Sequence, residues 1–166
     1  MNRWRDTFAH NYDNSRPVLR QSFEDTININ DIKDLKGNIV SWQYNKSSTP
    51  IGILSGKWSL AQVLANNTNT TKPDIVFTTN MTITGVDGLD SHKYQLWEFK
   101  NLKITLTGKT AIINGTVSLI LKSRPAVYSA SMSIRIMNLE TISINIDKNL
   151  ARHYFGDTPI YGTISN

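Results

Sequence analysis

Apolar and polar residues alternate along much of the chain between Asp74 and Asp147, and turn residues interrupt the alternation at intervals. The alternation is cleanest over residues 74–84, where apolar residues such as Phe77 and Met81 share one side and threonines lie mainly on the other. A period of two is typical of a β-strand with one buried face and one exposed face. The pattern therefore predicts an all-β protein.

The expected strands follow one another through short turns. Gly108 and Lys109 resemble a two-residue hairpin turn, and residues 138–140 form another tight turn. Sequential hairpins favour an antiparallel meander of about eight or nine strands, closed or nearly closed into a lipocalin-like barrel, over a sandwich. A barrel also removes exposed strand edges. Strands are expected over residues 39–44, 51–64, 74–84, 91–100, 102–107, 110–121, 127–137, 141–147 and 159–164, with a short helix over 148–155. Residues 26–30 alternate briefly and are a candidate for an additional first strand.

The chain of 166 residues is most simply one domain with a polar extension. Residues 1–36 show no strong period, and we expect this N-terminal segment to be partly ordered by docking onto a barrel formed by residues 37–166. Residues 91–100 interrupt the regular pattern, because bulky side chains occur at both even and odd positions. The inward face of that strand is therefore not assigned from the sequence.

The composition excludes several kinds of site and partner. The chain has no cysteine, which excludes disulfides, thiolate nucleophiles and cysteine-based zinc sites. The net charge is +5, and the charges of residues 1–36 balance, so the β region carries the whole excess. A mild basic excess can attract nucleic acid, anionic lipid or acidic glycans. Lysines between 93 and 109 lie near aromatic residues, but they are too few for a typical nucleic-acid surface, so nucleic acid is not an expected partner.

No apolar run approaches the roughly 18 residues that a membrane-spanning helix requires. The residues after Met1 are polar and show no signal-peptide pattern. A surface rich in Asn, Ser and Thr with only 19% charged residues is commoner on exported β-rich domains than on cytosolic helical ones. We therefore expect an extracytoplasmic protein, secreted or at the cell surface, on the assumption that a leader has been removed.

No catalytic signature is present, neither a Gly-x-Ser-x-Gly elbow nor a glycine-rich phosphate loop. The chain is therefore not expected to be an enzyme. An eight-stranded barrel can hold one small apolar ligand. Aromatic residues that would line its mouth, and so form the candidate ligand site, are Tyr94, Trp97 and Tyr161.

Histidines provide a second candidate site. His92 follows Asp90 closely, and a final segment folded over this strand would bring His153 near both. Imidazole and carboxylate groups are common ligands of copper and zinc. The spacing His-x-His is missing, so this metal site is the alternative hypothesis rather than the leading one.

Glycosylation sequons of the form Asn-x-Ser/Thr occur at several positions. Asn66 and Asn69 lie in an expected loop and are the best acceptors, and Asn80 lies on the polar face of an expected strand. Such sites would be modified only in an exported chain.

Two motifs resemble those of small uncharacterised exported β-domain proteins of ammonia-oxidising archaea. One is Gly-Lys-Trp-Ser-Leu at residues 56–60, and the other is His-Tyr-Phe-Gly-Asp-Thr-Pro-Ile-Tyr-Gly at residues 153–162, with Asp-Gly at 87–88 and His92 between them. The resemblance covers about residues 50–166. It implies export and a β-rich fold, and it implies no activity.

These observations predict a non-enzymatic extracytoplasmic β domain that binds a small ligand or acts as a cell-surface interaction module. The alternative is a copper- or zinc-binding protein that uses His92 and His153. The identity of the ligand and the oligomeric state stay open.

Overall fold

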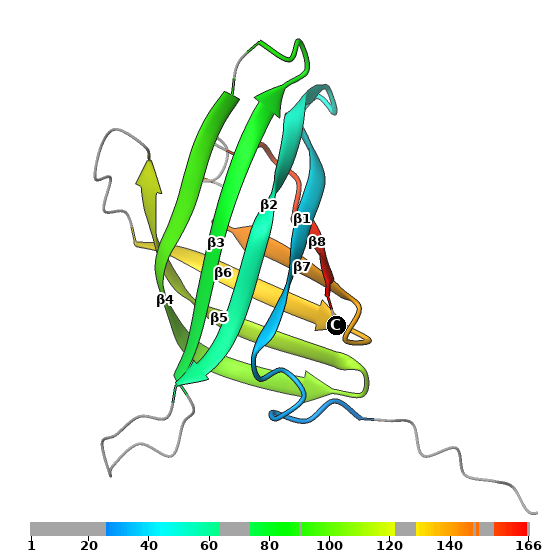
Figure 1. Ribbon diagram of the computed structural model, residues 1–166, viewed down its shortest axis with the longest axis vertical. Helices are drawn as coiled ribbons and strands as arrows, with labels where there is room; N and C mark the ends of the chain where they lie inside the picture. The colour runs from blue at the N-terminus through cyan, green and yellow to red at the C-terminus, as the bar shows by residue number, and fades with distance from the viewer. Residues whose placement is uncertain are drawn as a thin grey trace, which may run out of the picture.

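The computed structural model describes residues 26–63, 74–89, 91–121, 129–147, 149 and 155–165, with the backbone alone for residues 63, 74, 92–98, 101–102 and 119–121. Eight antiparallel strands run through these residues (Figure 1). They are β1 (Leu35–Tyr44), β2 (Pro50–Val63), β3 (Asp74–Gly85), β4 (Ser91–Thr107), β5 (Thr110–Leu121), β6 (Ser129–Met137), β7 (Thr141–Ile146) and β8 (Ile160–Ile164).

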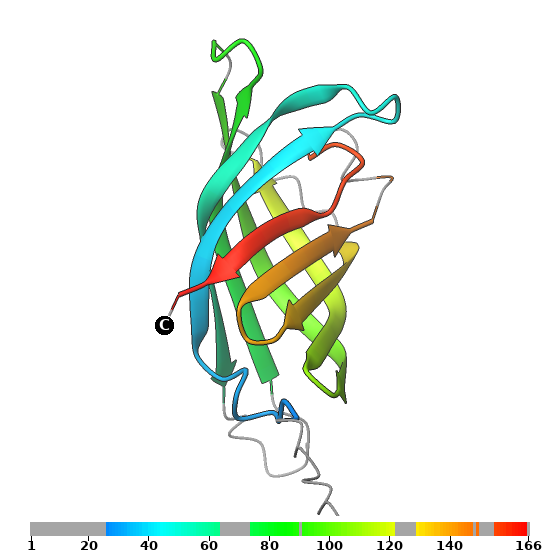
Figure 2. The same cartoon turned by 90° about the vertical axis from the view of Figure 1, so that its right-hand side faces the viewer.

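Each strand pairs with the next along the chain, and β8 returns to pair with β1, so the meander closes into a barrel. The closing seam is short, because its ladder joins three residue pairs from Gly37–Ile164 to Ile39–Gly162. Figure 2 shows β8 lying between β1 and β7 along this seam. The predicted all-β barrel is confirmed. No helix within the described residues has the length and hydropathy needed to span a bilayer.

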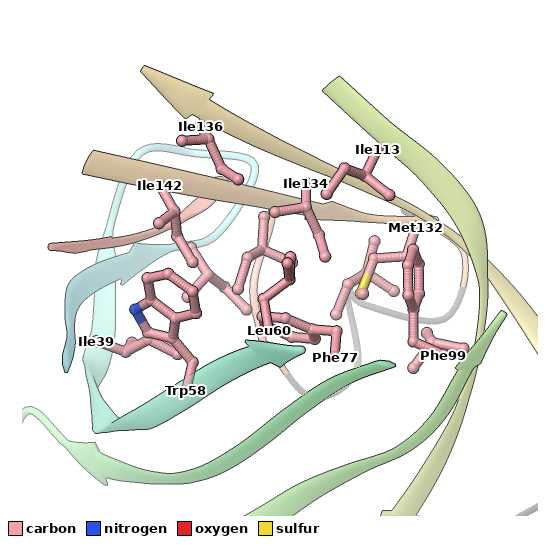
Figure 3. Close-up of a cluster of buried hydrophobic side chains, with 14 of the residues drawn as sticks. Ile39, Trp58, Leu60, Phe77, Phe99, Ile113, Met132, Ile134, Ile136 and Ile142 are labelled. Atoms are coloured by element: carbon pink, nitrogen blue, oxygen red, sulfur yellow. The ribbon is translucent and has the colours of Figure 1, made fainter. Parts of the chain in front are cut away.

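The core occupies the space between the strands (Figure 3). Strand β6 illustrates its origin, because every second residue from Ala130 to Ile136 is buried and the residues between them are exposed or half-buried. Burying each such side chain stabilises the fold by roughly 1.5–3 kcal/mol. The period of two that predicted the strands therefore also selects the residues of the core.

The N-terminal end of the described chain differs from its predicted structure. The candidate strand over residues 26–30 is a loop, because the Asn28 side chain accepts a hydrogen bond from the N–H of Asn30 at 2.9 Å and holds a turn. Strand β1 begins at Leu35, earlier than expected, and includes Gly37. The expected helix over residues 148–155 lies almost entirely outside the described residues.

Residues 91–107 form one strand rather than the two that were expected. The register of β4 against β5 shifts between Trp97 and Phe99 and again between Asn101 and Lys103. Each bulge adds a residue to one strand and so exchanges the positions that face inward. This exchange explains why alternation failed over this segment of the sequence.

Candidate functional site

The interior of the barrel is filled by apolar side chains. Met81 and Ile134 are fully buried. The ring of Phe77 lies 6.2 Å from that of Trp58 and 6.3 Å from that of Phe99, measured between centroids (Figure 3). Protein interiors of this kind pack about as densely as organic crystals. The core therefore does not favour the predicted internal cavity for a small apolar ligand.

Apolar side chains also cover the two ends of the barrel. At one end, the loop before β1 buries Ile27 and Ile32, and the N–H of Ile27 donates to the carbonyl oxygen of Gly108 at 2.9 Å. At the other end, Phe155 is buried just before β8. A ligand that reached the interior would have to displace these side chains.

Of the three residues predicted to line the barrel mouth, the structure describes the side chain of Tyr161 alone. Tyr161 lies in β8 with 51% of its surface exposed, while its neighbours Ile160 and Gly162 are buried, so its ring faces solvent rather than the interior. Tyr94 and Trp97 lie in β4, and only their backbone is described.

The predicted metal and glycosylation sites lie largely outside the described chain. His92 is the first pairing residue after Ser91 in β4, and its side chain is not described. His153 and Asp90 fall outside the described residues, as do Asn66 and Asn69. Among the residues that the structure describes, no group of three or more His, Cys, Asp or Glu side chains could hold a metal ion. The copper or zinc hypothesis stays a prediction.

The structure instead shows a depression on the outer wall of the barrel, with a volume of about 650 Å³. It is open to solvent and lies over the parts of β1, β2 and β3 nearest the C-terminus of the chain. Its lining residues are Lys36, Gly37, Asn38, Lys57, Trp58, Ser59, Thr78, Thr79, Asn80 and Ser165.

The strand register places the polar side chains of the depression in two rows. In one row Lys36 is opposite Ser59, which is opposite Thr78 on the next strand. The hydroxyl oxygens of Ser59 and Thr78 are 2.6 Å apart and form a hydrogen bond. Lysine, asparagine, serine and threonine side chains therefore project together from three neighbouring strands.

The second row consists of Asn38, Lys57 and Asn80. Lys57 is a diagonal neighbour of Lys36, and residues in such positions have Cα atoms roughly 7–8 Å apart. A carboxylate, phosphate or sulfate group could therefore contact both ammonium groups at once.

The strands around the depression carry almost no negative charge. Strands β1, β2 and β8 contain no aspartate or glutamate, and β3 contains only Asp74 at its start. Among the described residues, neither Lys36 nor Lys57 has an ion-pair partner. Two exposed ammonium groups on strands without carboxylates attract anions.

Trp58 fixes the wall beneath the depression. Its side chain is buried, and its indole Nε1 donates a hydrogen bond across β1 to the carbonyl oxygen of Thr163 in β8 at 3.2 Å. Gly37 permits this contact, because a Cβ atom there would collide with the same carbonyl oxygen and lie 2.9 Å from Nε1. Strand β2, which carries Lys57, is therefore bonded to β8 across β1, which carries Lys36.

Sequence reasoning missed this site. Residues 56–60, which include Lys57, were singled out only as one of the two motifs that carry the resemblance. The available signal was the lack of acidic residues from residue 35 to residue 63, with Lys57 in an expected strand. Lys36 was expected to precede the first strand of the barrel, so it was not recognised as part of the same face. Their proximity depends on the pairing register, which the sequence pattern alone does not supply.

Comparisons of the chain with protein-family models, with curated proteins and with solved structures gave no significant match. The resemblance to exported archaeal β-domain proteins therefore stays an expectation, and any function has to be argued from the geometry.

Proposed function

We propose that this protein is a non-enzymatic binding module that holds an anionic ligand on its outer wall, in the depression over β1, β2 and β3. The observation that carries the proposal is the pair of exposed lysines, Lys36 and Lys57, on two neighbouring strands that contain no carboxylate. The filled core supports it, because the outer surface is the part of the described barrel with room for a ligand.

The chemistry of the lining supports binding rather than catalysis. The depression offers ammonium, amide and hydroxyl groups, and its lining contains no imidazole or carboxylate that could act as a general acid or base. These groups instead suit recognition, since ammonium groups pair with anions and amides and hydroxyls bond to neutral oxygens. A role outside the cytoplasm or at the cell surface is part of this proposal and rests on the composition and the resemblance.

The proposal is tested with inorganic tripolyphosphate, a compact anion, titrated into isotopically labelled protein and followed by amide chemical shifts. We expect Lys36→Ala and Lys57→Ala each to weaken binding roughly fivefold, because an exposed ion pair contributes on the order of 1 kcal/mol. Binding should also weaken as salt is raised, because both lysines are exposed.

Lys46→Ala and Lys109→Ala are the matched controls. Both remove one positive charge from an exposed turn outside the depression. An equal loss of affinity in all four variants would show attraction by net charge alone, and unchanged affinity in Lys36→Ala and Lys57→Ala would refute the proposed site.

A further inference from the structure

The outer wall continues beyond the depression as an apolar and aromatic surface. Val40 and Trp42 follow Lys36 and Asn38 on the outward face of β1, with 71% and 51% of their surfaces exposed. Large apolar side chains exposed side by side on a soluble protein commonly mark a binding surface. This surface shares strand β1 with the anionic site.

Tyr161 extends the aromatic surface across the barrel seam. The ladder ends with the pair Ile39 and Gly162, and Val40 and Tyr161 are the next residues of the two strands beyond it. Tyr161 is 51% exposed, and Trp42 is opposite Ile53 on the other side of β1. The apolar and aromatic surface therefore extends from Ile53 on β2 over β1 to Tyr161 on β8. Figure 2 shows these three strands in one wall.

The two parts of the wall form a track along β1. From Lys36 to Trp42 the strand rises by roughly 20 Å, since each residue adds about 3.3 Å. Polar and cationic side chains occupy the first half of the track, and apolar side chains occupy the second. A ligand that used the whole track would be elongated, with negative charge and apolar faces.

We infer that the wall binds an acidic oligosaccharide, an inference that rests on the proposed anionic site. The carboxylate of a uronic acid unit would pair with Lys36 and Lys57, and its hydroxyls would bond to the amides of Asn38 and Asn80. The apolar faces of sugar rings further along the chain would stack on Trp42 and Tyr161. Each group on the ligand thus meets a side chain of matching chemistry.

Single-stranded nucleic acid fits the same track less well. It carries one phosphate per nucleotide, and proteins that bind it follow the backbone with a groove rich in positive charge. The described track offers two lysines, against several amide and hydroxyl groups that match sugar hydroxyls. An oligosaccharide with carboxylates at some units is therefore the better match.

The backbones that carry the aromatic residues are fixed before a ligand arrives. Trp42 and Tyr161 lie on strands and have partners in the neighbouring strands, Ile53 and Ser143 respectively. Rigid aromatic side chains lose little conformational entropy on binding, which favours recognition of a weakly interacting surface such as a sugar face.

The test is a length series of oligogalacturonates with two, four and six units, followed by calorimetry. We expect affinity to rise at least tenfold from the dimer to the hexamer in the unmodified protein. Trp42→Ala and Tyr161→Ala should each reduce this gain to threefold or less, while tripolyphosphate affinity stays within twofold. Leu89→Ala, which removes an exposed apolar side chain from the β3–β4 turn, should leave the gain unchanged.

The outcomes separate this inference from the proposed site. Affinity independent of length, or a length gain that survives Trp42→Ala, would overturn the oligosaccharide track while leaving the lysine site intact. Tripolyphosphate affinity that is unchanged in Lys36→Ala and Lys57→Ala would overturn the proposed site itself. Tighter Trp42-dependent binding of a thymidine hexanucleotide than of the hexagalacturonate at equal salt would show that the ligand is nucleic acid, against the inference.

Discussion

Gly37 and Gly162 mark the closest approach of backbones in the molecule's seam. A Cβ atom on Gly37 would collide with the carbonyl oxygen of Thr163, and a Cβ atom on Gly162 would lie 2.6 Å from that of Asn38. Both glycines also lie beside the Trp58 indole, which bonds to Thr163. Lack of a side chain at these two positions is therefore a requirement for closure.

At the residue scale, we expect Gly37→Ala to lower the free energy of unfolding by about 1–3 kcal/mol, as overpacking usually does. Urea unfolding followed by tryptophan fluorescence measures the change. Gly108→Asn is the control, because a side chain at Gly108 meets nothing within 4 Å and asparagine tolerates its positive φ of 52°. A loss in Gly37→Ala no larger than in the control would contradict the close approach.

The segment before β8 completes the seam as an element. The Asp157 N–H donates to the Tyr44 carbonyl oxygen at 2.8 Å. Gly156 has a φ of 76°, and a Cβ atom at this position would lie 2.7 Å from the same Tyr44 oxygen. Phe155 is buried beside them. The described part of the motif that suggested the resemblance thus has a structural role in closing the barrel.

A small polar network inside this seam gives a prediction for the element. The Thr158 hydroxyl donates to Oε1 of Gln43 at 3.1 Å, and Nε2 of Gln43, which is fully buried, donates to Ser41 at 2.9 Å. Thr158→Val should cost about 1–3 kcal/mol, because it leaves a buried carbonyl oxygen without its partner. The double variant with Gln43→Leu should cost less than the sum of the two single changes, as measured by urea unfolding, and additive costs would contradict the coupling.

The strands could be predicted from the sequence where neighbouring residues alone determine which side chains face the core. Period-two alternation identified β2, β3, β5, β6 and β7 with small errors at their ends, because adjacent residues alone decide which side faces the core. It failed in β4, where bulges change the inward face, and at Asn28, where a side chain holds a turn. The depression was not predictable, because its lysines meet only through the register of β1 against β2.

At the scale of the whole molecule, closure of the barrel by β1 and β8 joins segments more than a hundred residues apart. The Ser165 N–H donates to the Lys36 carbonyl oxygen at 2.8 Å, so Asn38 and Thr163, two residues further along, form a hydrogen-bonded pair as well. Cα atoms of such pairs lie about 5.5 Å apart, within the range that a disulfide spans.

This spacing makes closure testable in a chain that has no cysteine. We expect the double variant Asn38→Cys and Thr163→Cys to form an intramolecular disulfide on mild oxidation. Its thermal midpoint should then exceed that of the reduced form, since a cross-link over a loop this long stabilises by up to roughly 4–5 kcal/mol. Mass spectrometry and calorimetry give the two readouts, and a chain that forms only intermolecular disulfides would contradict the closed seam.

The filled core and the two exposed lysines together support the proposal that the protein binds its ligand on the outside of the barrel. The most direct measurement is a nuclear magnetic resonance titration of the labelled protein with tetragalacturonate, in which every backbone amide and core methyl group is followed. We expect the largest shifts at Asn38, Lys57 and Asn80, with core methyl groups such as those of Met81 and Ile134 unchanged. Shifts concentrated in the core methyl groups, with the outer wall unaffected, would contradict the account.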